Sequence, residues 1–181
     1  IAMANNYESP RSWQWNVALQ QEVANGLTVG ADFVYINTVH LQRNRDWNIP
    51  APVVPASDLS QRQCFGIRGG TPCSTQARPI PTLNSVQVRE TISRALYRGT
   101  TLRAAYRRKN YQFQAYYTLS TNYSDDDNER DAGGLSYENA FNLQPEYNYS
   151  NLDARHLFVF NSVVELPWDF GVSGLMKIRS G

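Results

Sequence analysis

The 181-residue sequence is poor in the residue types that build most catalytic and metal sites. It has two histidines, two cysteines and two methionines, and only 18% of its residues are charged. The 17 lysines and arginines nearly balance the 16 acidic residues, which excludes a nucleic-acid protein with a generally basic surface. No run of about 18 apolar residues occurs, so the sequence predicts no transmembrane helix. A mean hydropathy of −0.51 still allows membrane strands, because barrel strands alternate and average out polar.

The scarcity of histidine also argues against an enzyme. The two histidines are His40 and His156, and only Asp153 and His156 suggest an acid–base pair. These two residues are three apart on an expected strand, so their side chains would point to opposite faces. We therefore expect no catalytic residue and no enzymatic activity.

What the sequence does have is a strict two-residue alternation that is rich in aromatic residues. From Trp13 to Leu41 the odd positions are mostly apolar and the even positions mostly polar or small, with a hairpin signal at Ala24-Asn25-Gly26. The same unit returns at about 96–120 and 152–179, with turns at 107–110 and 167–169. Such long alternating strands exceed the usual length of about five or six residues in soluble proteins.

The connections between these hairpins indicate the architecture. Short turns alternate with two long polar segments, about 42–94 and 121–151, as in outer-membrane barrels with short periplasmic turns and long extracellular loops. We predict an all-β fold: part of one antiparallel up-and-down transmembrane β-barrel domain, with about six strands in hairpins 12–41, 96–120 and 152–179. The expected location is the bacterial outer membrane. Because six strands cannot close a membrane barrel, we expect 1–181 to be an internal piece of a longer protein, without a signal peptide, a plug domain or the remaining strands.

Alternation alone does not decide which face meets lipid, since a soluble secreted barrel or sandwich alternates too. Aromatic residues near expected interfaces favour lipid outside: Trp13 and Trp15 at one level, and Tyr106 and Tyr111 beside a short turn. The membrane hypothesis predicts that five apolar residues face lipid, whereas the soluble alternative buries them in a dry core. These residues are Leu27, Val29, Phe33, Phe113 and Phe158.

Three stretches resemble consecutive barrel hairpins of TonB-dependent outer-membrane receptors, closest to the Oar-like branch. The first is Ser12-Trp-Gln-Trp-Asn-Val with Asn25-Gly-Leu-Thr-Val-Gly-Ala-Asp-Phe-Val-Tyr. The second is Tyr97-Arg-Gly-Thr-Thr-Leu-Arg-Ala-Ala-Tyr-Arg-Arg with Phe113-Gln-Ala-Tyr-Tyr-Thr-Leu-Ser120. The third is Asn151-Leu-Asp-Ala-Arg-His-Leu-Phe-Val-Phe, leading to Glu165-Leu-Pro167.

This resemblance implies a barrel of about 22 strands plugged by an N-terminal domain. It implies uptake of a ligand, not identified by the sequence, with energy passed through TonB. The partners implied are outer-membrane lipid and lipopolysaccharide, the protein's own plug domain and TonB, with no nucleic acid. A non-transport barrel that serves as an adhesin, binding module or scaffold is the alternative function.

The two cysteines lie in a stretch rich in glycine and proline. Cys64 and Cys73 have no histidine nearby and lack a C-x-x-C spacing, so a zinc or redox site is disfavoured. We predict a disulfide that closes a small loop in an oxidising compartment, with two free thiols as the alternative.

The segment 121–151 is acidic, with seven carboxylates against one arginine. Oxygen ligands at this density could bind Ca²⁺, although the spacing is not that of an EF-hand. The candidate ligands are Asp125, Asp126, Asp127 and Glu129. The alternative is a solvated loop, and we expect no other cofactor.

The segment 42–94 is basic, with seven arginines against three acids. Its charge suggests pairing with the acidic segment or with lipopolysaccharide, and Arg43, Arg45 and Arg68 are candidate ligand-binding residues. Arg103 is a further candidate, because its position in the alternation directs it to the lumen, where it could contact a plug domain or a substrate.

Overall fold

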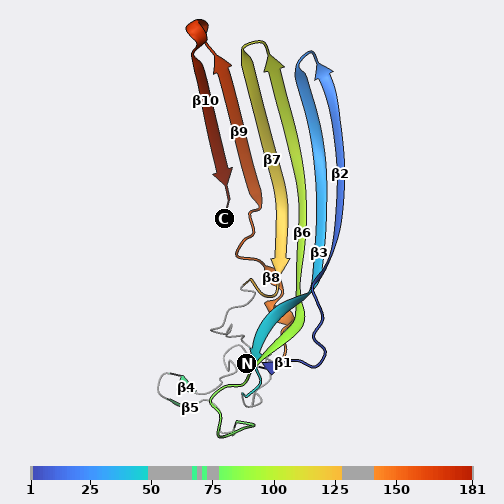
Figure 1. Cartoon of the computed structure of the whole chain (residues 1–181), viewed down its shortest axis with the longest axis vertical. Coiled ribbons are helices and arrows are strands. Elements are labelled where there is room, and N and C mark those ends of the chain that lie inside the picture. The colour runs from blue at the N-terminus through green and yellow to red at the C-terminus, as the bar shows by residue number, and fades with distance from the viewer. Residues whose placement is uncertain (1, 49–66, 69–70, 73–77, 128–140, 181) are drawn as a thin grey trace. The chain divides into compact units, whose positions relative to one another are not determined.

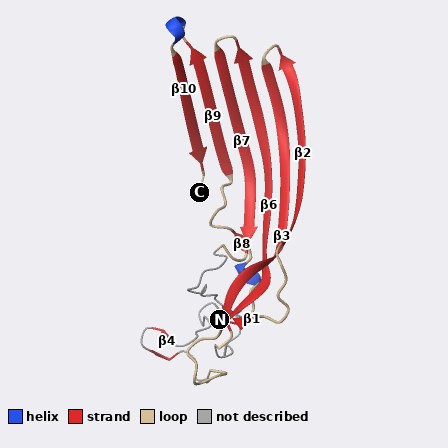
Figure 2. Ribbon diagram, in the orientation of Figure 1, coloured by secondary structure: helices blue, strands red, loops and turns tan. Residues whose placement is uncertain are grey.

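The computed structural model describes residues 2–48, 67–68, 71–72, 78–127 and 141–180. Its six long strands are β2 (Arg11–Ala24), β3 (Leu27–Asp46), β6 (Gln87–Arg108), β7 (Tyr111–Ser124), β9 (His156–Glu165) and β10 (Gly171–Arg179). They lie side by side in the order β10-β9-β7-β6-β3-β2, as Figures 1 and 2 show. This is the predicted up-and-down meander, and the sheet is not closed.

Several short elements complete the described chain. Strand β1 (Ala2–Met3) pairs in parallel with β6, and β8 (Asn148–Tyr149) pairs with β7. Strands β4 (Ile67–Arg68) and β5 (Thr71–Pro72) form a separate two-stranded sheet. The 3₁₀ turns are η2 (Gln144–Glu146) and η3 (Pro167–Asp169). Within the described residues, no helix is long and apolar enough to cross a membrane.

The chain divides into two compact units, which we describe separately. The wall unit comprises residues 12–38, 95–123 and 149–181, and the loop unit comprises residues 1–11, 39–94 and 124–148. The long strands β3, β6 and β7 contribute residues to both units.

The first hairpin turn needs its glycine. Gly26 has a φ of 80°, a left-handed conformation that glycine adopts without steric cost. Its carbonyl also accepts a hydrogen bond of 2.7 Å from the Arg107 amide, and a Cβ at Gly26 would collide with the Arg107 carbonyl oxygen. The predicted Asn25-Gly26 turn is confirmed, and it also joins β3 to its other neighbour, β6.

The strands extend further than the sequence predicted. Strand β3 continues to Asp46 instead of ending near 41, β6 begins at Gln87 instead of 96, and β7 reaches Ser124 instead of 120. The alternation in β3 breaks at His40, whose φ of 60° marks a local irregularity of the strand. Beyond it the side chains contact one another as buried polar groups, which a period-two hydrophobic pattern cannot reveal.

The register of the wall unit puts the apolar positions on one face. One row across β7, β9 and β10 holds Ala115, Phe160 and Met176, and the next holds Tyr117, Phe158 and Ile178. The row between them, Tyr116 with Val159 and Lys177, belongs to the opposite face, as does the row of Gln114, Asn161 and Leu175. Because successive side chains of a strand alternate, a single sheet separates an apolar face from a more polar one.

Aromatic rings link neighbouring strands on the apolar face. Phe113 stacks against Tyr106 at 6.5 Å, Tyr111 at 6.3 Å and Phe160 at 6.3 Å between ring centroids. Stacked pairs of this kind add about 0.5–1.5 kcal/mol each beyond the burial of their area. This ladder joins β6, β7 and β9, and it places Phe113 on the face that the alternation assigns to it.

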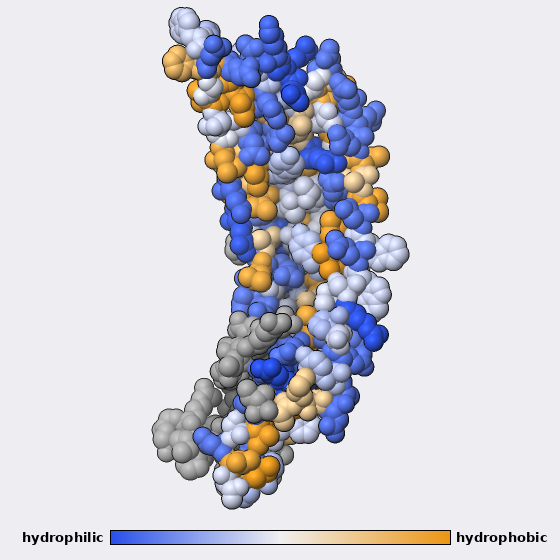
Figure 3. Space-filling view, viewed as in Figure 1, coloured by the Kyte–Doolittle hydropathy of each residue, from blue (hydrophilic) through white to orange (hydrophobic). Residues whose placement is uncertain are grey.

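The wall unit has no apolar core beneath this face. Among the described residues, the largest fully buried side chains are the polar Arg43, Asn48 and Ser93, all in the loop unit. Large apolar side chains of this face are exposed instead, among them Leu19 at 75% and Ile178 at 56%. Figure 3 shows hydrophobic side chains open on the surface over the strands, among hydrophilic ones. Among the described residues, the apolar face of this open sheet is therefore uncovered.

Candidate functional site

An ion pair between the basic and the acidic segment lies at the centre of the loop unit. Arg43, from β3, has its Nη2 atom 3.0 Å from Oδ1 of Asp125, which follows the end of β7. Both side chains are buried, with 1% and 8% of their surfaces exposed. Asp126 adds a second carboxylate, with Oδ2 at 3.9 Å from the Arg43 Nε atom. The prediction that the two segments of opposite charge pair is confirmed at Arg43.

Asp125 is held by a set of hydrogen bonds as well as by charge. Its Oδ1 atom accepts from the Ser93 hydroxyl at 2.5 Å and from the Arg94 amide at 2.8 Å. Arg43 in turn donates to the Asp125 carbonyl oxygen at 2.5 Å. A buried ion pair is costly to break from one side, because the remaining charge stays buried. This cluster therefore stabilises the loop unit and is not exposed to a ligand.

The structure brings only part of the predicted calcium ligands together. Asp125 and Asp126 contact Arg43, and Glu129 lies outside the described residues. In the part of the chain that the structure describes, no group of three His, Cys, Asp or Glu side chains could hold a metal ion. The calcium site, with Asp127 as its remaining described ligand, stays a prediction.

Arg45 belongs to a second cluster, which includes residues that the sequence did not indicate. Its Nη2 atom donates to Glu90 Oε1 at 2.6 Å, and its guanidinium lies 5.1 Å from the centre of the Trp47 ring. The Trp47 indole donates to the same Glu90 oxygen at 3.0 Å. Arg45, Trp47 and Glu90 thus form a fixed arrangement of a guanidinium, an indole and a carboxylate.

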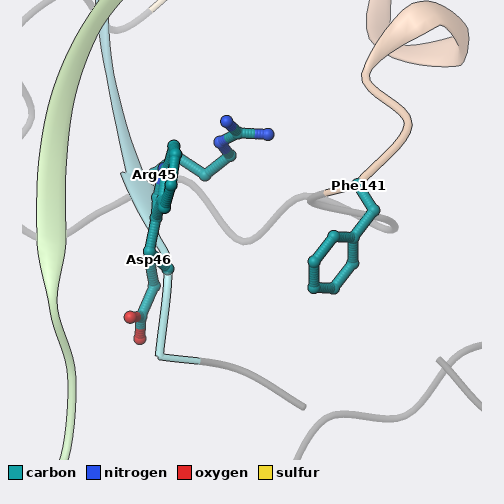
Figure 4. Close-up of a pocket in the computed structure, with 4 residues that line it drawn as sticks. Arg45, Asp46 and Phe141 are labelled. Atoms are coloured by element: carbon teal, nitrogen blue, oxygen red, sulfur yellow. The ribbon is translucent and has the colours of Figure 1, made fainter. Parts of the chain in front are cut away.

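A small cavity adjoins this cluster within the loop unit. Arg45, Asp46, Trp47 and Phe141 line it, and its volume is about 160 Å³. Figure 4 shows the Phe141 ring across a gap from Arg45. Trp47 and Phe141 remain 55% and 56% exposed. Two exposed aromatic rings beside a guanidinium can contact the apolar face of a small ligand.

The buried side-chain amide of Asn48 fixes the end of β3 to the segment before β6. The Asn48 side chain donates to the carbonyl oxygens of Ile80 and Leu83, at 3.0 and 2.7 Å, and accepts from the Ile80 amide at 2.8 Å. Asp46 Oδ1 accepts from the Asn48 and Val86 amides, at 2.8 and 2.9 Å. Asp46 is therefore engaged in holding the backbone. No sequence motif marked these residues, because their partners lie in a distant segment.

Arg103 lies on the more polar face of the wall unit. Its Nε atom is 3.4 Å from Oδ2 of Asp32 on β3, and both side chains are partly exposed. Gly30, two residues before Asp32, leaves the space that this guanidinium occupies, since a Cβ there would lie 2.6 Å from Arg103 Nε. The alternation predicts the face on which the Arg103 side chain lies. Its partner Asp32 and the space above Gly30 depend on the pairing of β3 with β6, which the sequence pattern does not reveal.

Three of the predicted site residues give no side-chain information here. Arg68 lies on β4, and only its backbone is described. Cys64 and Cys73 lie outside the described residues, so the disulfide stays a prediction.

One comparison with known proteins gives a match. The model of a family described as an outer membrane beta barrel domain matches residues 1–177. Neither the search of curated proteins nor that of solved structures finds a match. The match covers both units and agrees with the meander of long strands.

Proposed function

We propose, from the premise that this chain belongs to the outer membrane beta barrel domain family and lies in the bacterial outer membrane, that it forms part of the barrel of a TonB-dependent transport receptor. In this proposal the barrel takes up a ligand through its lumen and catalyses no reaction. The assignment to the Oar-like branch rests on the resemblance of the three hairpins.

The observation that carries the proposal is an unclosed sheet with one uncovered apolar face. The sheet has six long strands, and β2 and β10 are its two edges. An unpaired edge cannot face lipid, and known single-chain membrane barrels have at least about eight strands. Further strands must therefore complete the barrel, and a large barrel is the kind that carries a plug.

The apolar face then contacts lipid and the more polar face contacts the lumen. Phe113, Phe158 and Phe160 lie on the first, whereas Arg103 and Asp32 lie on the second. We assign to the Arg103–Asp32 pair a role in contacting the plug domain, because both side chains remain partly exposed and carry charge toward the lumen. The short hairpin turns would lie in the periplasm, where the plug meets TonB.

The loop unit would lie outside the cell and contact ligand and lipopolysaccharide. Arg45 with Trp47 and Phe141 is the better candidate for ligand contact, since this cavity is open and two of its rings are exposed. Arg43 is buried against Asp125, so we give it a stabilising role instead.

The proposal is tested on the full-length protein purified from outer membranes. We expect a heat-modifiable band in electrophoresis, no steady conductance in planar lipid bilayers because a plug closes the lumen, and binding to the periplasmic domain of TonB. A heat-modifiable barrel that conducts steadily would contradict a plugged receptor and indicate an open channel. A closed barrel that does not bind TonB would favour the adhesin or scaffold alternative.

A further inference from the structure

A second cavity lies in the wall unit, and its lining contains none of the residues that the sequence marked as a site. Its volume is about 270 Å³, and its walls come from β6, β7, β9, β10 and the segment before β9. Lys177 and Arg179, on β10, supply its charged side chains.

The register places this cavity on the more polar face. Arg179 is paired with Leu157, and Leu157 is paired with Thr118, so these three residues form one row across β10, β9 and β7. All three line the cavity. The adjacent row, Tyr117 with Phe158 and Ile178, belongs to the apolar face. On the proposed function, the cavity therefore opens to the lumen and not to lipid.

The two charged side chains that line the cavity are both positive, and the neighbouring Asp153 carboxylate accepts from the Asn122 backbone amide at 2.6 Å and lies 4.0 Å from Arg155 Nε. The cavity lining contains Lys177 and Arg179 and no aspartate or glutamate. The Lys177 side chain makes no hydrogen bond or ion pair with any residue that the structure describes, whereas its backbone pairs with Val159. Arg179 is oriented by hydrogen bonds to two backbone carbonyls, those of Leu152 at 3.2 Å and Asp153 at 3.4 Å, which leave its charge unneutralised.

The spacing of the two cations suits a single anionic group. Residues two apart on one strand point to the same face, with their Cα atoms about 7 Å apart. Long lysine and arginine side chains at that separation can both reach one phosphate or carboxylate. A guanidinium binds such a group through two nitrogen atoms, and an ammonium adds a mobile point charge.

Neutral groups around the cations indicate the rest of the ligand. Ser120 donates its hydroxyl to the Ala154 carbonyl at 2.9 Å, so its oxygen can still accept a hydrogen bond. Asn122 adds an amide, and Leu152 and Leu157 provide apolar surface. Hydroxyl and amide groups beside apolar surface are what a sugar ring requires, since its hydroxyl edge is polar and its face is not.

We propose that this cavity is a lumenal subsite for an anionic sugar, one that carries a phosphate or a carboxylate. The inference rests on the proposed function, because only a lumen makes the polar face accessible to a ligand. Lys177 and Arg179 bind the anionic group, and the neutral side chains contact the ring. The sugar phosphates of lipopolysaccharide share this chemistry, but the lumenal face selects a soluble ligand.

The test measures binding to the full-length protein in detergent by isothermal titration calorimetry. The probes are glucose 6-phosphate, glucuronate and, as the neutral reference, glucose. We expect either anion to bind more tightly than glucose, and Lys177→Gln to weaken its binding about tenfold or more, since a charge-assisted hydrogen bond is lost. Lys177→Arg keeps the charge and retains binding. Lys109→Gln is the matched control, because it removes the same charge from a turn outside the cavity.

Several results would overturn the subsite. One is that neither anion binds, and another is that glucose binds as tightly as the anions. A third is that Lys177→Gln and Lys109→Gln weaken anion binding equally. The second arm of the test uses purified lipopolysaccharide as the probe. If Lys177→Gln weakens binding of lipopolysaccharide and neither soluble anion binds, the choice of a soluble ligand would be overturned. A protein that binds TonB but shows no Lys177-dependent binding refutes the subsite alone. A protein that shows Lys177-dependent binding but no interaction with TonB refutes the transport function alone.

Discussion

A charged side chain at Phe160 tests the assignment of the apolar face to lipid. Phe160 is the fifth of the ten residues of β9 and is paired with Ala115 and Met176, so it lies near the middle of the wall. An arginine or lysine at the bilayer midplane costs about 2–4 kcal/mol in a membrane barrel. Loss of the stack with Phe113, at 6.3 Å, adds about 0.5–1.5 kcal/mol. We therefore expect Phe160→Arg to destabilise the folded barrel by roughly 3–5 kcal/mol.

The matched control is the next residue along the same strand. Asn161 points to the opposite face, between Gln114 and Leu175, so Asn161→Arg puts the same charge into the lumen. We expect it to cost less than about 1 kcal/mol, because lumenal groups are hydrated.

The assay is folding of the full-length protein into lipid vesicles, with the urea midpoint read from the heat-modifiable band in electrophoresis. Phe160→Arg should shift the midpoint strongly to lower urea, and Asn161→Arg should shift it little. Equal shifts, or a larger shift for Asn161→Arg, would refute the assignment of the faces.

Three further predictions concern the loop unit and the first turn. Asp125→Ala leaves the Arg43 charge buried without its carboxylate and should destabilise the loop unit by about 3–5 kcal/mol, measured as faster limited proteolysis of the folded barrel. Unchanged cleavage would contradict the stabilising role of this pair. Gly26→Ala forces a left-handed conformation on a residue with a Cβ and collides with Arg107, so we expect a loss of about 1–3 kcal/mol in the same urea assay. A neutral result would mean that the turn can adopt another conformation. Trp47→Ala should weaken ligand uptake without lowering the amount of barrel in the membrane, and normal uptake would exclude this cavity as a contact.

The loop unit reverses the usual distribution of polar and apolar groups. Among the described residues, the largest fully buried side chains are polar and belong to this unit: Arg43, Asn48 and Ser93. The aromatic side chains of Trp47 and Phe141 are instead more than half exposed. Buried polar groups with satisfied hydrogen bonds favour one arrangement of the segments over others, because alternatives leave these groups unpaired. Exposed aromatic rings held on such a framework keep a defined position, which the proposed contact with a ligand requires.

Local sequence pattern is sufficient to predict the central part of each long strand, the turns and the two faces of the wall. Trp13 to Leu41 alternates with a period of two, and this period is a geometric property of one strand that needs no partner. The turn at Gly26 and the turn at 167–169 are also local, since glycine tolerance for positive φ and the proline at position 167 act within a few residues. The fold class and the residues that share each face could therefore be predicted before any contact was known.

The contacts between side chains of different strands depend on the three-dimensional arrangement of the sheet. Arg43 and Asp125 were both marked for their charge, but they are 82 residues apart, and their pairing depends on strand register and on where β7 ends. Arg103 reaches Asp32 because β6 lies beside β3 and because Gly30 leaves room for its side chain. The cavity of Lys177 and Arg179 is formed by several strands at once, so no single stretch of sequence contains it. Contacts between strands follow from the order and register of the sheet, which local periodicity does not specify.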